Sequence, residues 1–230
     1  GHKKVRPPIV VGHEICARTL GTLRLPNGQI IAEDRRVIVS PLIPCLKCHN
    51  CNAGYFNCGN KRNEIGSSVN GGFADYINIP ENNILINGIV PIESNIHDDE
   101  ASLIEPLSCC LNAYLNINNS IHDEYVIIIG DGPIGLIHLQ ISKLSGAKTI
   151  VVGKIPSRLN EAKSIGADMI LLNNDPEESL RKIWDHTYEK GGKLIIVATS
   201  NPEAIDLALK VAGKNSLISL FAGISKNKLL

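Results

Sequence analysis

The sequence predicts an α/β protein in which a β-rich first half is followed by a doubly wound parallel sheet. Three observations lead to this prediction. Residues 1–115 carry short apolar segments separated by turns and prolines, which is typical of a β-rich domain. Residues 116–230 alternate near-continuous apolar segments with helix-like stretches, which is typical of a parallel sheet covered on both faces. A glycine-rich loop follows the first apolar segment of this second half. We therefore predict two domains, 1–115 and 116–230.

The first half contains four candidate strands and one candidate helix start. The strands are apolar segments bounded by turn residues, at 9–11, 37–39, 76–79 and 84–86. Asp98, Asp99 and Glu100 then precede an apolar-periodic stretch. Carboxylates at this place meet the positive end of a helix dipole, so we expect a helix to begin there.

The second half contains five candidate strands and four candidate helices. The strands are expected at 125–129, 149–152, 169–172, 194–198 and 217–221. The helices between them are expected at 134–144, 157–165, 176–184 and 202–211. A full Rossmann sheet has six strands, so one more strand would be needed.

Composition is that of a globular protein and argues against several kinds of partner. Hydrophobic residues make up 43% and charged residues 20% of the chain, and the formal net charge is zero. Without a basic excess, we expect neither a nucleic acid nor an anionic membrane as partner. The apolar runs are too short to span a bilayer, and no signal peptide opens the chain. The expected compartment is the cytoplasm.

The chain is expected to be part of a longer protein. Its only methionine is Met169, so it carries no initiator residue, and the count of five strands leaves the second domain one short. We therefore expect the first domain to be truncated at its N-terminus and the second at its C-terminus.

The glycine loop indicates a dinucleotide site. Gly130, Gly132 and Gly135 fit the pattern G-x-G-x-x-G, directly after a strand and at the start of a helix. The first glycine permits a tight turn, the second lets backbone approach a pyrophosphate, and the third lets the helix lie close to the strand. The helix N-terminus adds free N–H groups and about half a positive charge. We expect the cofactor to be bound by Gly130, Gly132, Pro133, Ile134 and Gly135.

The end of the second strand favours NADP over NAD. An NAD site usually has an acidic residue about 20 positions beyond the glycine loop, where it binds the adenosine ribose. This place is held by Gly153 and Lys154, and no acidic residue occurs between Asp131 and Glu161. A glycine leaves room for a 2′-phosphate, and Lys154 or Arg158 could pair with it. The alternative is that both basic side chains are solvated surface charges.

Four cysteines crowded into one loop indicate a structural zinc. Cys45, Cys48, Cys51 and Cys58 could close a tetrahedron around zinc, and four protein ligands leave no open position for chemistry. Cysteines so close in sequence rarely form mutual disulfides. Two rival interpretations are a c-type haem, because His49 completes a C-x-x-C-H motif, and an iron–sulfur cluster. Neither explains all four cysteines as well as zinc does.

Taken together, these motifs resemble the zinc-containing medium-chain dehydrogenases, in the branch of the sorbitol and threonine dehydrogenases. The resemblance runs through essentially the whole chain. Besides the cysteine and glycine motifs, it is carried by Gly12-His13-Glu14, Gly71-Gly72-Phe73-Ala74 and Glu105-Pro106-Leu107-Ser108-Cys109-Cys110. It implies a GroES-like β-rich domain followed by a Rossmann domain.

The resemblance also implies a catalytic zinc. In such proteins this ion is held by an upstream cysteine, by a histidine matching His13 and by an acidic residue matching Glu14 or Glu105. The upstream cysteine would precede the present chain, so the fragment by itself is expected to be inactive. The gap between Cys51 and Cys58 is one residue shorter than is common in the family. Outside the family context, His13, Glu14 and Glu105 could each have an ordinary structural role.

The function that the resemblance implies is hydride transfer between a secondary alcohol or polyol and NAD(P), giving a ketone. Zinc would act as a Lewis acid on the substrate oxygen, and the nicotinamide would carry the redox step. Relatives imply a homo-dimer or homo-tetramer. Two alternatives are a zinc-free quinone or enoyl reductase of the same superfamily and a non-catalytic dinucleotide-binding protein.

Overall fold

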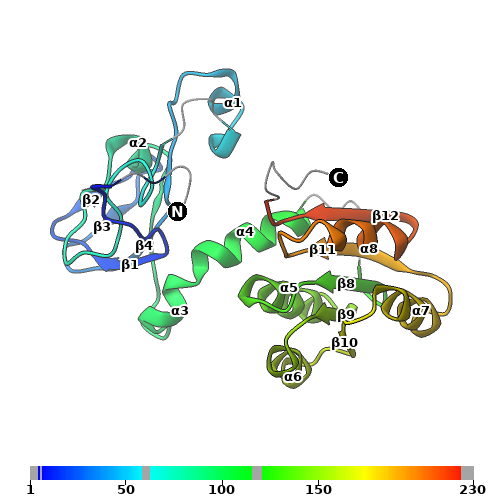
Figure 1. The fold of residues 1–230 in the computed structure, drawn as a ribbon. Helices are drawn as coiled ribbons and strands as arrows, with labels where there is room; N and C mark the ends of the chain where they lie inside the picture. The colour runs from blue at the N-terminus through cyan, green and yellow to red at the C-terminus, as the bar shows by residue number, and fades with distance from the viewer. Residues whose placement is uncertain (1–4, 6, 59–62, 116–120, 224–230) are drawn as a thin grey trace. The chain divides into compact units, whose positions relative to one another are not determined.

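The computed structural model describes residues 5, 7–58, 63–115 and 121–223, and the chain divides into two compact units, Gly1–Leu107 and Ser108–Leu230 (Figure 1). This division falls inside helix α4 (Ile104–Leu115). The boundary predicted between residues 115 and 116 stays a prediction. Among the described residues, none of the helices is long and apolar enough to cross a membrane.

The first unit is built from small antiparallel sheets with short helices around them. Its main sheet has the order β1-β4-β7, and two further antiparallel pairs join β2 to β3 and β5 to β6. The strands are β1 (Ile15–Arg18), β2 (Leu23–Arg24), β3 (Ile30–Ile31), β4 (Arg36–Val39), β5 (Leu42–Ile43), β6 (Asn63–Glu64) and β7 (Ile89–Pro91). The helical elements are α1 (His49–Asn52), a 3₁₀ turn at Phe56–Cys58, α2 (Glu81–Ile84), α3 (Asp98–Ser102) and the start of α4.

The core of the first unit follows the period-two pattern of its strands. In β4, Val37 and Val39 are buried whereas Ile38, between them, is half-buried. The buried cluster around them consists of Ile15, Leu25, Ile31, Val37, Val39, Ile43, Ile65 and Ile89. This unit is therefore a β-rich domain, as its sequence predicts.

Three strands predicted in the first half are wrong. Residues 9–11 and 76–79 lie outside the strands, and 84–86 covers the end of α2 and the turn after it. Ile77 and Ile79 still pack against the core cluster, so their alternation reflects burial of an extended segment without a strand ladder. Pro80 precedes α2 and Gly88 follows its turn, which explains the local helical conformation. The strand at 37–39 and the helix start at Asp98 are confirmed.

The second unit contains a five-stranded sheet in which all neighbouring strands are parallel. The strand order is β10-β9-β8-β11-β12. The strands are β8 (Tyr125–Ile129), β9 (Lys148–Gly153), β10 (Met169–Leu172), β11 (Gly192–Val197) and β12 (Ala212–Leu220). The helices between them are α5 (Pro133–Leu144), α6 (Pro156–Ile165), α7 (Pro176–His186) and α8 (Glu203–Lys210). All nine predicted elements are confirmed, with ends shifted by a few residues.

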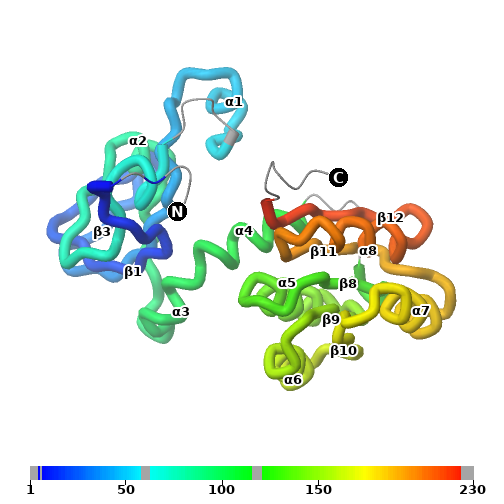
Figure 2. The backbone as a smooth tube through the Cα atoms, viewed as in Figure 1, coloured from blue at the N-terminus to red at the C-terminus, as the bar shows by residue number. Residues whose placement is uncertain are grey.

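Helices cover both faces of this sheet, as the backbone trace shows (Figure 2). On one face, Ile127 and Ile129 of β8 pack with residues of α7 and α8, such as Ile183 and Leu207. On the other face, Ile128 packs with residues of α5 and α6. Because both faces are buried, the strands consist of continuous apolar residues, and this arrangement is the doubly wound Rossmann-type fold.

A histidine is enclosed in the packing of α5. His138 is 0% exposed, and its Nδ1 lies 3.2 Å from the hydroxyl of Tyr114, which also donates to the His138 carbonyl. The ring of Phe221 packs edge-on against it at 4.8 Å between centroids. Burial lowers the pKa of His138 from 6.5 to about 4. The side chain is therefore neutral at pH 7.

Acidification is expected to destabilise the protein through His138. Between pH 6.5 and about 4 the unfolded chain binds a proton at this residue and the folded chain does not, so the free energy of unfolding falls as pH falls. At pH 5 the loss relative to pH 7 amounts to about 2 kcal/mol. Urea unfolding at both pH values should reveal this loss in the wild type and its absence in His138→Leu. The exposed His186, changed to leucine, serves as the control. An unchanged pH dependence in His138→Leu would contradict the prediction.

Candidate functional site

The glycine loop has the geometry that a pyrophosphate requires. Gly130 directly follows β8 and begins the loop with φ of +131°, a backbone conformation that glycine adopts readily. A Cβ on Gly135 would overlap the carbonyl oxygen of Gly130, so this glycine permits close approach of α5 to the loop. A Cβ on Gly132 would meet nothing within 4 Å, and α5 begins directly after it. The open space beside Gly132 at a helix N-terminus fits a phosphate group.

A cavity of about 260 Å³ lies at the carboxyl ends of β8, β9 and β11. In open α/β sheets this is where ligands bind. The cavity brings together five of the predicted cofactor residues, namely Gly130, Gly132, Gly153, Lys154 and Arg158. Pro133, Ile134 and Gly135 lie in the first turn of α5 and are not among its lining residues.

Two carboxylates that line the cavity, those of Asp131 and Glu203, make it less positive than the sequence suggests. Lys154 Nζ lies 3.8 Å from Glu203 Oε2, so its charge is partly compensated by a carboxylate from α8. The side chain of Asp131, which is 8% exposed, accepts hydrogen bonds from the backbone N–H groups of Lys154 and Ile155. The sequence pattern does not point to Asp131 or Glu203, since neither residue directly follows the second strand of this unit.

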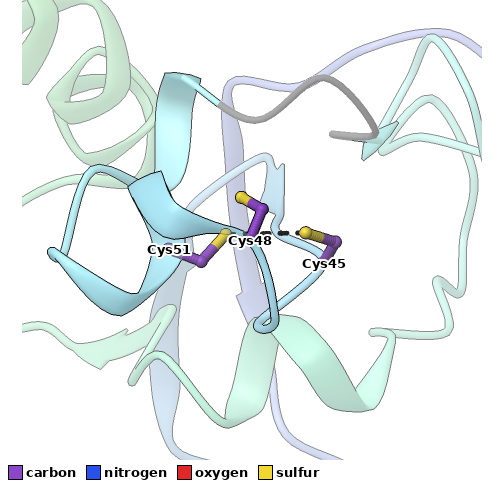
Figure 3. A group of neighbouring side chains, drawn as sticks. All are labelled: Cys45, Cys48 and Cys51. Atoms are coloured by element: carbon purple, nitrogen blue, oxygen red, sulfur yellow. Dashed lines mark hydrogen bonds between the residues drawn. The ribbon is translucent and has the colours of Figure 1, made fainter.

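Three cysteines of the first unit converge, as Figure 3 shows. Cys45 precedes α1, Cys48 is its N-cap residue and Cys51 is buried within it. Their sulfur atoms all lie within 4.8 Å of one another, and Cys45 Sγ is 3.8 Å from Cys51 Sγ. Cys58 ends the following 3₁₀ turn, and its side chain lies outside the described part of the structure.

The thiol geometry fits a tetrahedral metal site. Zinc–sulfur bonds of about 2.3 Å in a tetrahedron separate neighbouring sulfurs by about 3.8 Å, which matches the distance between Cys45 and Cys51. Hydrogen bonding from the backbone N–H of Lys47, followed by the Cys48 thiol and N–H, lowers the pKa of Cys45 to about 7. Burial, by contrast, raises the pKa of Cys51. A soft sulfur donor set of this kind would hold zinc.

A second group of donor atoms lies in the same unit. One ligand atom each of His13, Glu14 and Glu105 lies within 4.8 Å of the others. His13 and Glu14 are exposed, immediately before β1, and Glu105 is half-buried in the first turn of α4. One imidazole and two carboxylates are donors that zinc accepts, so this group also fits a metal ion.

Close backbone packing positions His13 and Glu14. Gly12 has φ of +100°, and its carbonyl accepts a hydrogen bond from the N–H of Gly72 at 2.9 Å. A Cβ on Gly66 or Gly71 would collide with the Gly12 backbone. The segment before His13 thus packs directly against the backbone of Gly66 and Gly71. The contact is so close that neither of these two positions can carry a side chain.

An ion pair attaches α3, the helix before the one that carries Glu105, to strand β4. Arg36 of β4 donates to Asp98 Oδ1 through Nε at 2.9 Å and through a terminal nitrogen at 2.6 Å. The same guanidinium donates to the carbonyl of Ile96. Hydrogen bonding from Arg36 lowers the pKa of Asp98. The start of α3 is thereby fixed to the sheet, and α4 with Glu105 follows directly.

The fold and these sites define a class of protein: a dinucleotide-binding fold joined to a β-rich unit with two potential metal sites. Residues 1–90 match the alcohol dehydrogenase GroES-like domain, and residues 133–229 match the zinc-binding dehydrogenase family. The chain belongs to the zinc-containing medium-chain alcohol and polyol dehydrogenase family.

Individual relatives agree with this assignment. The chain is 31% identical to L-threonine 3-dehydrogenase of Pyrococcus furiosus over 225 residues, which covers 96% of this chain and 62% of the relative. It is 32% identical to galactitol 1-phosphate 5-dehydrogenase of Escherichia coli K12 over 219 residues, covering 93% of this chain and 59% of the relative. The chain therefore spans about three fifths of the length of these curated relatives.

Solved structures share the fold. The crystal structure of galactitol-1-phosphate dehydrogenase from Escherichia coli matches with a TM-score of 0.82 at 24% identity, over 98% of this chain and 63% of that chain. Alcohol dehydrogenase TADH from Thermus sp. ATN1 matches with a TM-score of 0.81 at 22% identity, over 95% of this chain and 64% of that chain. The predicted fold class, a GroES-like unit followed by a Rossmann sheet, is confirmed.

Proposed function

We propose that the intact protein is a zinc-dependent dehydrogenase that transfers hydride between a secondary alcohol or polyol and a nicotinamide dinucleotide, giving a ketone. The observation that carries the proposal is the group formed by His13, Glu14 and Glu105, whose ligand atoms lie within 4.8 Å of one another. Such a reaction needs a place for a Lewis-acidic metal ion and a place for the dinucleotide. The donor group offers the first and the cavity at the glycine loop offers the second.

Each site has a distinct role in this proposal. His13, Glu14 and Glu105 would hold the catalytic zinc, which when bound supplies Lewis-acid polarisation of the substrate oxygen. Cys45, Cys48, Cys51 and Cys58 would hold a second, structural zinc. The backbone around Gly130 and Gly132 and the N-terminus of α5 orient the pyrophosphate, and so fix where the nicotinamide can reach.

The names of the relatives support a hydroxyl-bearing substrate. The similar proteins include dehydrogenases of L-threonine, galactitol 1-phosphate and sorbitol. By analogy, we propose a small alcohol or polyol for this protein too. We also propose that the intact protein is cytoplasmic and assembles into a homo-dimer or homo-tetramer. Gly153, Lys154 and Arg158 predict NADP as the coenzyme, whereas the carboxylate of Asp131 at the same place favours NAD.

The test is dinucleotide reduction by the intact protein, purified without chelators. With a panel of secondary alcohols and polyols, we expect an increase in the absorbance of reduced nicotinamide and about two zinc ions per subunit. Removal of zinc by a chelator should abolish turnover, and added zinc should restore it. A protein that contains no zinc, or that reduces the dinucleotide equally well after chelation, would overturn the proposal.

The same measurements separate the two alternative functions. A zinc-free quinone or enoyl reductase of this superfamily would oxidise NADPH with a quinone or enone and would contain no zinc. A non-catalytic dinucleotide-binding protein would bind cofactor but turn over none of these substrates. The converging thiols of Cys45, Cys48 and Cys51 favour the zinc-dependent enzyme over the zinc-free reductase, and turnover separates it from the non-catalytic protein.

A further inference from the structure

The carboxylate of Asp131 lies at the end of β9, although the residue belongs to the glycine loop. Its Oδ2 accepts hydrogen bonds from the N–H of Lys154 at 2.9 Å and of Ile155 at 2.7 Å, the two residues that follow this strand. A Cβ built on Gly153 would come within 2.6 Å of Asp131 Cγ. Asp131 therefore fills the space that a side chain on the last residue of β9 would need.

This position is the one from which dinucleotide-binding sheets usually contact the adenosine ribose. The acidic residue that binds the ribose hydroxyls ordinarily ends the second strand, and β9 is the strand that follows the glycine loop and its helix. Asp131 and Gly153 both line the cavity. The hydrogen bonds described for this carboxylate all end on Oδ2, so Oδ1 keeps its capacity to accept.

The charges around the cavity do not favour an additional phosphate. Its described lining carries two carboxylates, Asp131 and Glu203, and two basic side chains, Lys154 and Arg158. Lys154 lies within 3.8 Å of Glu203. A 2′-phosphate at the end of β9 would bring negative charge to the Asp131 carboxylate and would find the Lys154 and Ile155 amides already bonded.

We propose that Asp131 selects NAD over NADP, by accepting hydrogen bonds from the ribose hydroxyls and by repelling a 2′-phosphate. The proposal rests on the proposed function, because it requires a nicotinamide dinucleotide in this cavity. It opposes the sequence-based preference for NADP. The residues that follow β9 predict NADP, but the carboxylate at this place belongs to the loop that follows β8.

Asp131 also fastens the turn between β9 and α6, and the test must separate this structural role from the selection of a coenzyme. The substitution Asp131→Asn keeps an oxygen that can accept from both N–H groups but removes the charge. Asp175 is a matched control, because it too accepts two backbone N–H bonds at the start of a helix, α7, and it does not line the cavity.

Dissociation constants for NAD and NADP, measured by calorimetric titration of the intact protein, provide a readout that does not depend on turnover. We expect the wild type to bind NAD at least about tenfold more tightly than NADP. Asp131→Asn should narrow this ratio about tenfold or more, chiefly by tightening NADP binding. Asp175→Asn should leave the ratio unchanged.

Different outcomes distinguish failure of this proposal from failure of the proposed function. If the wild type prefers NADP, or if Asp131→Asn and Asp175→Asn give the wild-type ratio, Asp131 is not the selecting residue and the dehydrogenase assignment stands. If the wild type binds neither dinucleotide, the proposed function fails and the selection of a coenzyme fails with it. Should Asp131→Asn prove unfolded by circular dichroism, Asp131→Ser provides a second uncharged variant. It should also narrow the ratio of the two dissociation constants, and a wild-type ratio in Asp131→Ser would contradict the proposal.

Discussion

Replacing His13 by alanine is expected to lower kcat/KM for alcohol oxidation about a thousandfold. His13 is the only imidazole in the group that it forms with Glu14 and Glu105 among the described residues. Among the described residues its loss would leave only the two carboxylates of this group, and the site would lose the nitrogen donor that zinc prefers. Lewis-acid stabilisation of several kcal/mol corresponds to this change in rate.

Metal content makes the His13 experiment specific. The zinc content of His13→Ala should fall from about two ions to about one per subunit, because the cysteine site is separate. The affinity for the dinucleotide should stay at its wild-type value, since the glycine-loop cavity lies in the other unit. His186→Ala, at an exposed histidine of the second unit, is the control and should retain activity and zinc. Full activity in His13→Ala would remove this residue from the proposed site.

The second large effect is expected in the cysteine cluster. Cys51→Ser should lose the structural zinc and destabilise the segment from Cys45 to Asn57. The reason is that little apolar packing holds this segment, in which Cys51 is buried whereas Asn52, Ala53 and Tyr55 are exposed. Zinc bound by four protein ligands contributes on the order of 10 kcal/mol in small zinc domains, so loss of one ligand should cost several kcal/mol locally.

Limited proteolysis combined with metal analysis tests this prediction. The intact Cys51→Ser protein should contain about one zinc fewer per subunit and should be cleaved rapidly within this segment. A chelator should produce the same cleavage in the wild type. Cys109→Ser makes the same chemical change at an exposed cysteine outside the group and should behave like the wild type. A Cys51→Ser protein with unchanged zinc content and cleavage would contradict the structural-zinc assignment.

The sequence predicts the second unit better than the first, and the reason is physical. Strand β8 is buried at every position, so its apolar run is continuous, and the glycines after it are needed for their backbone conformation. In the first unit, Ile77 and Ile79 alternate with exposed residues as a strand would, yet they lie in an extended segment outside the sheets. Burial fixes the alternation, whereas a strand also requires a hydrogen-bonded neighbour that the local sequence does not specify.

The candidate sites also differ in how far the sequence predicts them, according to how close their residues lie in the chain. The spacing of Cys45, Cys48 and Cys51 is local, so their convergence could be predicted from the sequence alone. His13 and Glu105 are far apart in the chain, so local spacing does not predict that they meet, and only the family resemblance implies that they share a metal ion. The position of the Asp131 carboxylate cannot be predicted from the sequence, because its hydrogen-bond partners lie 23 and 24 residues further on, in a different loop.

The mutual exclusion of side chains at positions 131 and 153 has an evolutionary consequence. Since a Cβ at 153 would strike the aspartate, the two positions cannot both carry long acidic groups in this backbone conformation. Homologous chains that end the strand in an acid are therefore expected to bear a small residue as the second member of the loop. A pair of compensating substitutions could then move the selecting carboxylate between the loop and the strand end without a change of fold. Surveys that inspect the strand terminus alone would misassign such lineages.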